Sequence, residues 1–212
     1  MCGRFSVPDT ELLMKDFHLL AIPQSKARYN VAPSQNVLCI TAPQKAHLLE
    51  WGFLPSWAKD AKKLTAQINA RSETLLEKPF YKSSYLKRRC LIPISGFYEW
   101  KLVGAKKTPH YIKMKEQESF ALAGIWSEVE SLKKQSFAIL TTEPNELMNS
   151  IHNRMPVIIS AQFYDFWLNP ESPIADVQNL LQPFDSNKMK AYSVSTFVNS
   201  PKNDSPECIA PV

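Results

Sequence analysis

The residue with the richest chemistry in this chain is Cys2, which directly follows the initiator methionine. Because cysteine is small, Met1 can be removed, and Cys2 would then carry a free α-amine beside its thiol. The amine titrates near pH ~8 and the thiol near ~8.5, so both keep a reactive fraction at neutral pH. Such an aminothiol can form a Schiff base with an aldehyde and close it to a thiazolidine. The alternative interpretation is that Cys2 only begins a mobile terminus.

A second group of polar residues is Asn69 and Arg71, which stand two apart after an apolar residue. In an extended segment their side chains would point the same way. Asn69 offers a donor and an acceptor that suit holding an amine, and Arg71 suits a phosphate. The alternative is that Asn69 or Ser72 caps a following helix.

A third candidate is Glu99, which lies among large aromatic residues. In a strand, Glu99 would share one face with Phe97, whereas Tyr98 and Trp100 would share the other. A carboxylate between aromatic rings loses hydration, so its pKa rises toward the range of a general acid or base. The alternative is a surface strand on which Glu99 faces water.

A fourth candidate is His152, which precedes an expected strand and belongs to a loop, where functional groups are common. An imidazole with an unperturbed pKa near ~6.5 suits proton transfer at neutral pH. A structural hydrogen-bonding role is the alternative for His152. Arg154, two residues on, fits either a phosphate contact or a surface ion pair.

Composition indicates an ordinary globular protein of 212 residues, with 44% hydrophobic and 21% charged residues. The net charge of +5 permits a polyanionic partner without requiring one. No apolar run reaches the ~18 residues of a membrane-spanning helix, and no signal-peptide pattern is present. We therefore expect a cytoplasmic protein, and we take it to be a monomer. Because the four cysteines and four histidines are scattered, we expect no disulfide, metal or cofactor.

Short strand-like runs follow one another closely, with helical patterns between them and no βαβ rhythm. These features predict one α+β domain over residues 1–212, with a mostly antiparallel, barrel-like core flanked by helices. Strands are expected at residues 37–41, 47–51, 90–94, 97–101, 111–115, 120–126, 137–142, 157–160 and 192–197. Helices are expected after Pro8 and at residues 72–77, 144–150, 161–168 and 174–181.

Six motifs occur in a characteristic order and together resemble the SRAP family, the SOS response-associated peptidases. They are Met-Cys-Gly-Arg-Phe at 1–5, Arg-Tyr-Asn-Val-Ala-Pro at 28–33, Trp-Gly at 51–52, Asn-Ala-Arg-Ser-Glu at 69–73, Gly-Phe-Tyr-Glu-Trp at 96–100 and His-Asn-Arg-Met-Pro at 152–156. The resemblance covers essentially the whole chain. Only the segments 53–65 and 75–86 are less recognisable.

The resemblance implies a sensor and shield of abasic sites in single-stranded DNA. Cys2, freed of Met1, would condense with the ring-opened sugar aldehyde and leave a thiazolidine DNA–protein cross-link. Asn69 would orient the amine, Glu99 would move protons and protonate the sugar oxygen, and His152 would assist the Schiff-base steps. Weak abasic-site lyase activity and self-removal of Met1 are implied as well.

The same resemblance, together with residue type, suggests DNA contacts. Positive and polar residues would hold phosphates, and Pro33 and Trp57 would stack on bases beside the lesion. The expected phosphate contacts are Arg4, Asn30, Arg71 and Arg154, with Lys87, Arg88 and Arg89 as a further patch.

Two other function classes remain open from the sequence. One is an N-terminal-nucleophile amidohydrolase, in which the Cys2 thiolate attacks an amide. The other is a non-covalent binder of single-stranded DNA in which Cys2 is incidental. The first would release ammonia from glutamine, and the second would ignore a Cys2→Ala change.

Overall fold

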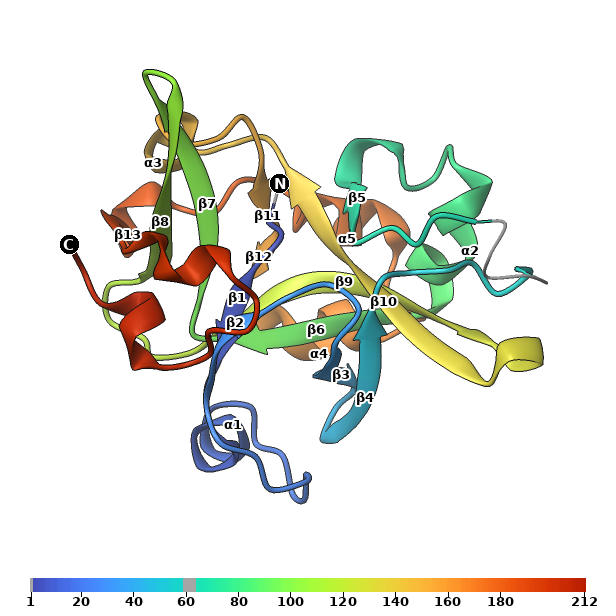
Figure 1. Ribbon diagram of the computed structural model, residues 1–212. Coiled ribbons are helices and arrows are strands. Elements are labelled where there is room, and N and C mark those ends of the chain that lie inside the picture. The colour runs from blue at the N-terminus through green and yellow to red at the C-terminus, as the bar shows by residue number, and fades with distance from the viewer. Residues whose placement is uncertain (1, 59–63) are drawn as a thin grey trace.

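Five strands close on one another to form the centre of the molecule (Figure 1). The computed structural model describes residues 2–58 and 64–212. The ring runs β10–β4–β3–β6–β9 and back to β10, and only the β4–β10 pairing is parallel. The strands are β3 (Asn36–Ala42), β4 (Lys45–Trp51), β6 (Arg89–Ile94), β9 (Phe120–Val129) and β10 (Lys134–Thr142). Closure leaves the ring without a free edge.

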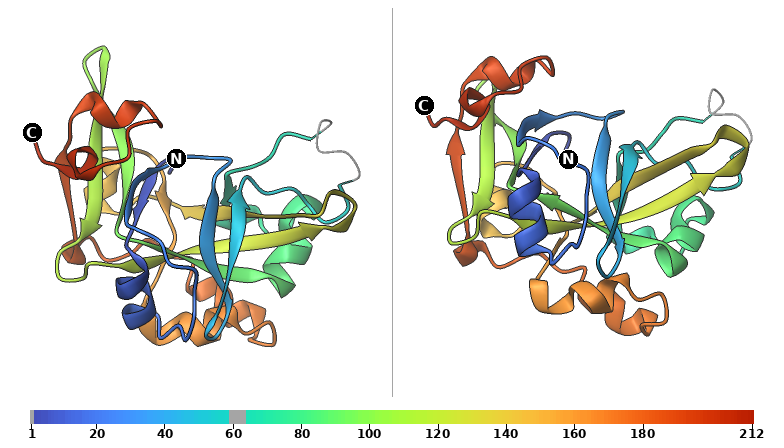
Figure 2. Two further views of the ribbon diagram at one scale, coloured as in Figure 1. Left: turned by 60° about the horizontal axis from the view of Figure 1, so that its bottom comes forward. Right: turned by 90° about the horizontal axis from the view of Figure 1, so that it is seen from below.

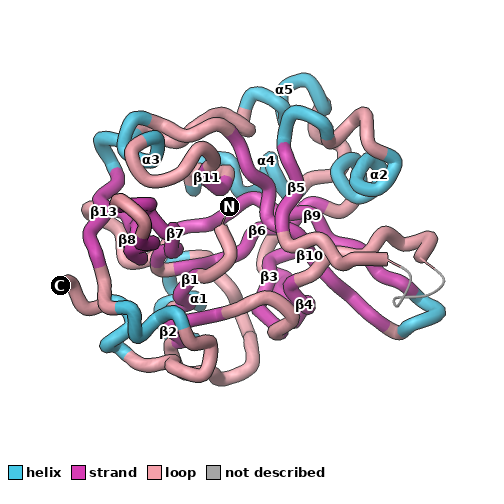
Figure 3. Tube along the Cα trace, turned by 45° about the horizontal axis from the view of Figure 1, so that its top comes forward, coloured by secondary structure: helices cyan, strands magenta, loops and turns pink. Residues whose placement is uncertain are grey.

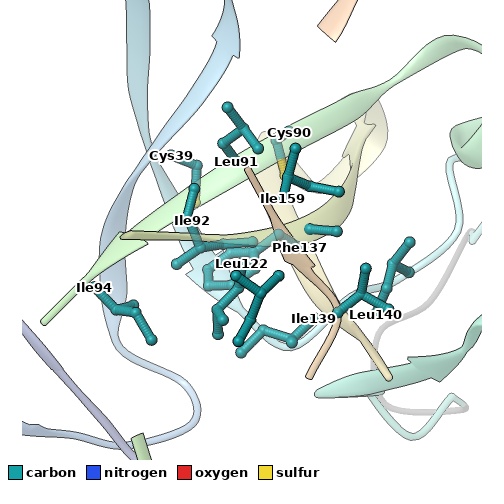
Figure 4. Packing of buried hydrophobic residues seen from close by; sticks show 14 of the residues in the cluster. Cys39, Cys90, Leu91, Ile92, Ile94, Leu122, Phe137, Ile139, Leu140 and Ile159 are labelled. Atoms are coloured by element: carbon teal, nitrogen blue, oxygen red, sulfur yellow. The ribbon is translucent and has the colours of Figure 1, made fainter. Parts of the chain in front are cut away.

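Apolar side chains from these strands fill the core (Figure 4). All six residues of β6 are buried, as are seven of the nine in β10. Strands buried on both faces lose the polar–apolar alternation of a half-exposed sheet. Gly124 in β9 allows a close approach, because a Cβ there would lie 2.4 Å from Ile92 Cδ1 and 2.9 Å from Cys90 Sγ.

A second, five-stranded antiparallel sheet stands beside the barrel in the order β13–β8–β7–β1–β2. Only Ser95 separates β6 from β7, so the chain passes there directly from the barrel into this sheet. Its strands are β1 (Phe5–Val7), β2 (Arg28–Val31), β7 (Gly96–Val103), β8 (Lys106–Met114) and β13 (Met189–Ser193). Three short strands complete the barrel side: β5 (Asn69–Arg71) and β11 (Met155–Pro156) on β10, and β12 (Ile158–Ile159) on β9.

Short helices cover the outside of both sheets (Figure 2). Asp9 caps the first helix by accepting a hydrogen bond from the Leu12 N–H, and Asn145 caps the third through the Met148 N–H. The helices are α1 (Thr10–Asp16), α2 (Pro79–Lys87), α3 (Glu146–Asn149), α4 (Tyr164–Leu168) and α5 (Ile174–Asn179). None of the described helices is long and apolar enough to cross a membrane.

The expected α+β class and barrel-like core are confirmed, and most expected strands appear within a few residues of their predicted bounds. The short strands β2, β5 and β11 were not among the expected strands, and three further elements differ. Helix α2 was not expected, because its sequence lacks a clear apolar stripe. Strand β1 was too short to detect. The expected strand at 192–197 was wrong in its second half, since β13 ends at Ser193 and Thr196–Asn199 form a 3-10 helix.

The N-terminus lies between the two sheets, and this placement organises the candidate site (Figure 3). Strand β1 pairs on one side with β2 and on the other with β7, where Phe5 lies opposite Phe97. Phe5 also packs its ring 4.7 Å from that of Trp51, which belongs to the barrel strand β4. The first strand therefore joins the two halves of the fold.

Candidate functional site

Cys2 is fully buried and precedes this joining strand, which begins at Phe5. Its thiol faces the carbonyl oxygen of Arg4, with Sγ 3.8 Å from that oxygen. The following residues are held by β-pairing, so Cys2 does not begin a mobile terminus. Burial raises the pKa of the Cys2 thiol, and the negative charge of Glu99 raises it further. The thiol is therefore protonated at neutral pH, and a free thiolate nucleophile is disfavoured.

Asn69 contacts Cys2 directly. Strand β5 lies parallel to β10, with Asn69 opposite Ile139, and the Asn69 Nδ2 donates a 3.0 Å hydrogen bond to the Cys2 carbonyl oxygen. The Asn69 Oδ1 is buried and accepts no hydrogen bond from the described residues. Neither Asn69 nor Ser72 caps the 3-10 helix Ser72–Thr74, which excludes the capping alternative. An acceptor beside the Cys2 backbone suits an amine N–H at this position.

Glu99 is the buried carboxyl group of the site, with only 3% of its surface exposed. It lies on β7 and shares the face of Phe97, as the strand pattern predicted, so the surface-strand alternative is excluded. Burial raises the pKa of Glu99, and the charge of His152 partly opposes that rise. A carboxyl group with a raised pKa can both donate and accept a proton near neutrality.

His152 is positioned by the turn that follows α3. Its backbone N–H donates to the Met148 carbonyl at 2.8 Å, and its ring Nδ1 accepts the Arg154 N–H at 3.0 Å. Nδ1 also lies 3.2 Å from the Arg154 carbonyl oxygen, so it accepts from the N–H in one tautomer and can donate to the carbonyl in the other. The electrostatic effect of His152 on Glu99 shows that the two groups lie near each other.

The fold thus gathers four residues from four distant segments. The Cys2 carbonyl oxygen accepts a hydrogen bond from Asn69. The charge of Glu99 raises the pKa of the Cys2 thiol, and the charge of His152 lowers the pKa of Glu99. The group comprises a buried thiol beside the chain terminus, an amide acceptor, a carboxyl group poised for proton transfer and an imidazole. Such a set suits condensation of an amine with a carbonyl compound, because every proton in that reaction has a nearby carrier.

Arg154 forms an ion pair rather than facing solvent freely. Its Nη1 and Nη2 donate to Glu73 Oε1 at 2.6 Å and Oε2 at 2.9 Å, and Nη2 also donates to the Thr141 carbonyl at 2.6 Å. The structure therefore shows Arg154 in an ion pair with Glu73. A phosphate contact by Arg154 would require release of Glu73. The pair also ties the loop of His152 to the segment of Asn69. Glu73 was not found from sequence, because its partner stands 81 residues away.

We expect the Glu73–Arg154 pair to stabilise the fold by about 0.5–1 kcal/mol, since Glu73 is 44% exposed and solvent screens the pair. Burial raises the pKa of Glu73, but hydrogen bonds from Arg154 outweigh it and hold the pKa below its usual value. The contribution is therefore present above the unfolded-state pKa and lost as pH falls through the folded-state pKa.

A double-mutant cycle of Glu73→Gln and Arg154→Met, measured by urea unfolding at neutral and acidic pH, checks this expectation. The Lys134–Glu50 pair, which has one contact at 2.8 Å, is the matched control with a smaller expected coupling. A coupling that is equally large in acid would contradict the assignment.

Asn30 is not available to DNA, and its assignment as a phosphate contact is corrected. It is only 1% exposed. Its Nδ2 donates to the carbonyl oxygens of Val198, Ser200 and Asn203, and its Oδ1 accepts from Arg4. Asn30 therefore fixes the C-terminal segment against β2.

Arg89 is likewise buried, and its assignment to DNA binding is wrong. Its guanidinium donates to the carbonyl oxygens of Tyr85, Leu86, Trp167 and Asn169 and is 3% exposed. Arg88 stacks over Trp126 at 5.3 Å, and Lys87 is exposed. Both lie at the end of α2, well apart from the N-terminus (Figure 1).

The remaining DNA-contact candidates keep accessible surface. Arg71 is exposed two residues beyond Asn69, and Arg4 is half-buried, with hydrogen bonds to the Val198 and Asn199 carbonyls. Trp57 is 56% exposed and meets Phe80 edge-on, and Pro33 is half-buried after β2. Within the loop 53–65, the lysines at 59, 62 and 63 lie outside the described residues.

The site does not coincide with the hollow beside β8. That hollow, of about 480 Å³, lies between the end of β8 and the segment after β12, and includes Tyr164 and Phe184. None of the four site residues lines it. The cluster of Cys2, Asn69, Glu99 and His152 is therefore separate from this hollow.

Comparison with known proteins decides the family. The model of the SOS response associated peptidase family matches residues 1–201. The chain belongs to the SRAP family. The abasic site processing protein YoqW of Bacillus subtilis is 44% identical to this SRAP chain, and the alignment covers 99% of both. The abasic site processing protein HMCES of Gallus gallus is 33% identical over 77% of this chain and 56% of its own length.

A solved structure has the same fold. The crystal structure of a protein from Bacteroides thetaiotaomicron superposes on this SRAP chain with a TM-score of 0.90 and 28% identity, over the full length of both. The fold described above is therefore shared across the whole domain.

Proposed function

We propose that this SRAP protein forms a covalent cross-link with abasic sites in single-stranded DNA through Cys2. The observation that carries the proposal is the buried cluster of Cys2, Asn69, Glu99 and His152. Relatives named abasic site processing proteins support the choice of substrate. Processing of abasic-site DNA damage is thus the general function, and the cross-link is the chemistry we infer for it.

The reaction begins when Met1 is removed and the Cys2 amine becomes free. The amine adds to the aldehyde of the ring-opened sugar, and the resulting carbinolamine loses water to give an imine. The Cys2 thiol then adds to the imine carbon, its proton passes to the nitrogen, and a thiazolidine ring results. The net change is the loss of one water molecule per cross-link.

Each neighbour has a role that its environment supports. The Asn69 Oδ1, which has no hydrogen-bond partner among the described residues, accepts an amine N–H and orients the nitrogen lone pair. Glu99, with its raised pKa, protonates the sugar ring oxygen and recovers a proton from the anomeric hydroxyl. It then protonates the departing carbinolamine hydroxyl and recovers a proton from the nitrogen. Last, it relays the thiol proton to the imine nitrogen. His152 relays protons at the imine stage.

Burial of the thiol fits this order of steps better than it fits thiolate attack. A thiol whose pKa is raised by burial waits in its protonated form until Glu99 becomes a carboxylate. Holding amine, thiol and aldehyde together supplies up to about 7–11 kcal/mol of the barrier reduction. The imine stage also permits elimination at the sugar, which gives weak lyase activity. Self-removal of Met1 is the peptidase activity that we propose for this chain.

DNA is held by the accessible candidates around the site. Arg71 and Arg4 bind phosphates, and Trp57 and Pro33 stack on bases next to the lesion. A missing base makes the sugar easy to expose, so single strands and duplex–single-strand junctions are preferred over intact duplex.

Intact-mass analysis tests the proposal. Purified protein is incubated with a single-stranded oligonucleotide that carries one abasic site and is then denatured. The mass of the product is measured by mass spectrometry. The expected product lacks Met1 and has the mass of protein plus DNA minus one water. Processed protein that gives no adduct, and instead releases ammonia from glutamine, would identify an amidohydrolase.

A further inference from the structure

The hairpin formed by β7 and β8 projects from the body of the protein (Figures 1 and 2). Its tip carries Leu102 and Val103, which are 64% and 55% exposed, and turns at Gly104 with φ +60°. Lys106 and Lys107 follow in exposed positions. An apolar, basic tip of this kind has no partner within the described residues.

The register of the hairpin separates its two faces. Glu99 lies opposite His110, Lys101 opposite Thr108, and Val103 opposite Lys106. Because alternate residues share a face and directly opposite residues share it too, Lys101, Val103 and Lys106 lie on the face of Glu99. We call these three residues the site-side face.

The other face of the hairpin is turned toward the C-terminal segment. It carries Trp100, Leu102 and Lys107, because Leu102 lies opposite Lys107. The Trp100 Nε1 donates to Asn199 Oδ1 at 2.8 Å, which fixes this orientation. The two faces therefore have different surroundings although they belong to one hairpin.

The site-side face begins close to the reacting group. At about 3.3 Å per residue, Lys101 lies ~7 Å and Val103 ~13 Å along the strand from Glu99. A DNA strand whose abasic sugar reaches Glu99 would meet these cations within the next nucleotides. Two lysines along one line match the phosphates of a polyanion.

We propose that the site-side face binds the nucleotides on one side of the abasic site. Lys101 and Lys106 bind phosphates, and Val103 packs against a sugar or base between them. The inference rests on the proposed function, because it takes DNA as the ligand, and it adds a defined second contact region. An anionic lipid surface is the competing ligand, since it also attracts lysines around an apolar tip.

The test measures equilibrium binding of single-stranded DNA in which a tetrahydrofuran replaces the abasic sugar. This analogue has no aldehyde, so binding is independent of the cross-linking chemistry. The variant is Lys101→Ser with Lys106→Ser. The matched control compares the single variants Lys106→Ser and Lys107→Ser, because both lysines are exposed but they lie on opposite faces of the hairpin. Oligonucleotides with both arms, only the 5′ arm or only the 3′ arm locate the contact.

The double variant is expected to bind with a log-affinity versus log-salt slope shallower by about 1.4, for two lost phosphate contacts. Between about 50 and 200 mM salt, the wild type should therefore lose about sevenfold more affinity than the variant. The difference should vanish when one particular arm is removed, and Lys107→Ser should behave as the wild type.

Several results would overturn the inference. The inference is overturned if the double variant binds the DNA with the affinity and the salt slope of the wild type. It is also overturned if the Lys106→Ser and Lys107→Ser variants lose the same amount of DNA affinity. Binding to phosphatidylserine vesicles that requires Lys101 and Lys106, with DNA affinity unchanged, would assign the hairpin to lipid instead. A wild type that binds this DNA but never cross-links to an abasic site would refute the proposed function and leave the hairpin inference standing.

Discussion

A Cys2→Ala variant is expected to form no denaturation-resistant adduct with abasic-site DNA, although it retains the α-amine after Met1 is removed. Alanine can still give an imine, but without the thiol the ring cannot close, and the imine hydrolyses when the protein unfolds. Adding borohydride during the reaction should reduce the imine and restore a stable adduct. Denaturing electrophoresis with and without the reductant measures both results.

The control for this experiment is Cys208→Ala. Cys208 is another buried thiol, with Sγ 3.4 Å from the Asn203 carbonyl oxygen, and it belongs to the C-terminal 3-10 helix Pro206–Ile209. This variant should cross-link like the wild type. A stable Cys2→Ala adduct without reductant would contradict the thiazolidine, and absence of an adduct even with borohydride would contradict the amine as nucleophile.

The second large effect is expected for Glu99→Gln. Glutamine keeps the shape of the side chain but cannot transfer a proton, so the rate of cross-linking should fall by about 10²–10⁴. Quenched time courses with abasic-site oligonucleotide give the rate, and the exposed Glu118→Gln change is the control. A rate within threefold of the wild type would exclude Glu99 as the proton carrier.

The same substitution should make the protein more stable at neutral and alkaline pH. Burial raises the pKa of Glu99 in the folded state, so the folded protein binds this proton more tightly than the unfolded chain does. Stability is then greatest below the unfolded-state pKa and declines as pH rises through the folded-state value. Glutamine carries no titrating proton, so the Glu99→Gln variant does not lose stability in this way as pH rises.

Thermal unfolding across pH measures this effect. The melting temperature of Glu99→Gln should exceed that of the wild type at about pH 8, and the difference should shrink toward about pH 4. If the Glu99→Gln variant is more stable but less active than the wild type, Glu99 serves the reaction and not the stability of the fold. A variant less stable than the wild type at every pH would show that Glu99 has a structural role instead.

The sequence by itself indicated the candidate residues of the site and the chemistry that each could perform. The ordered motifs carry Cys2, Asn69, Glu99 and His152, and each is a residue type whose reactivity is known before folding. The strand patterns likewise indicated the barrel, because the hydrophobic effect acts on composition and spacing, which can be read along the chain. The face of Glu99 within its strand followed from the period of two.

Only the tertiary structure decided which polar residues are free to meet a ligand. Arg89 and Asn30 have the right residue types for phosphate, but Arg89 binds the carbonyl of Trp167, 78 residues away, and Asn30 binds carbonyls 168 to 173 residues away. Arg154 is held by Glu73 in the same manner. A hydrogen bond depends on partners that distant segments bring together, and burial depends on everything packed above the group. Residue type fixes what a side chain can do, and the fold fixes whether it is already engaged.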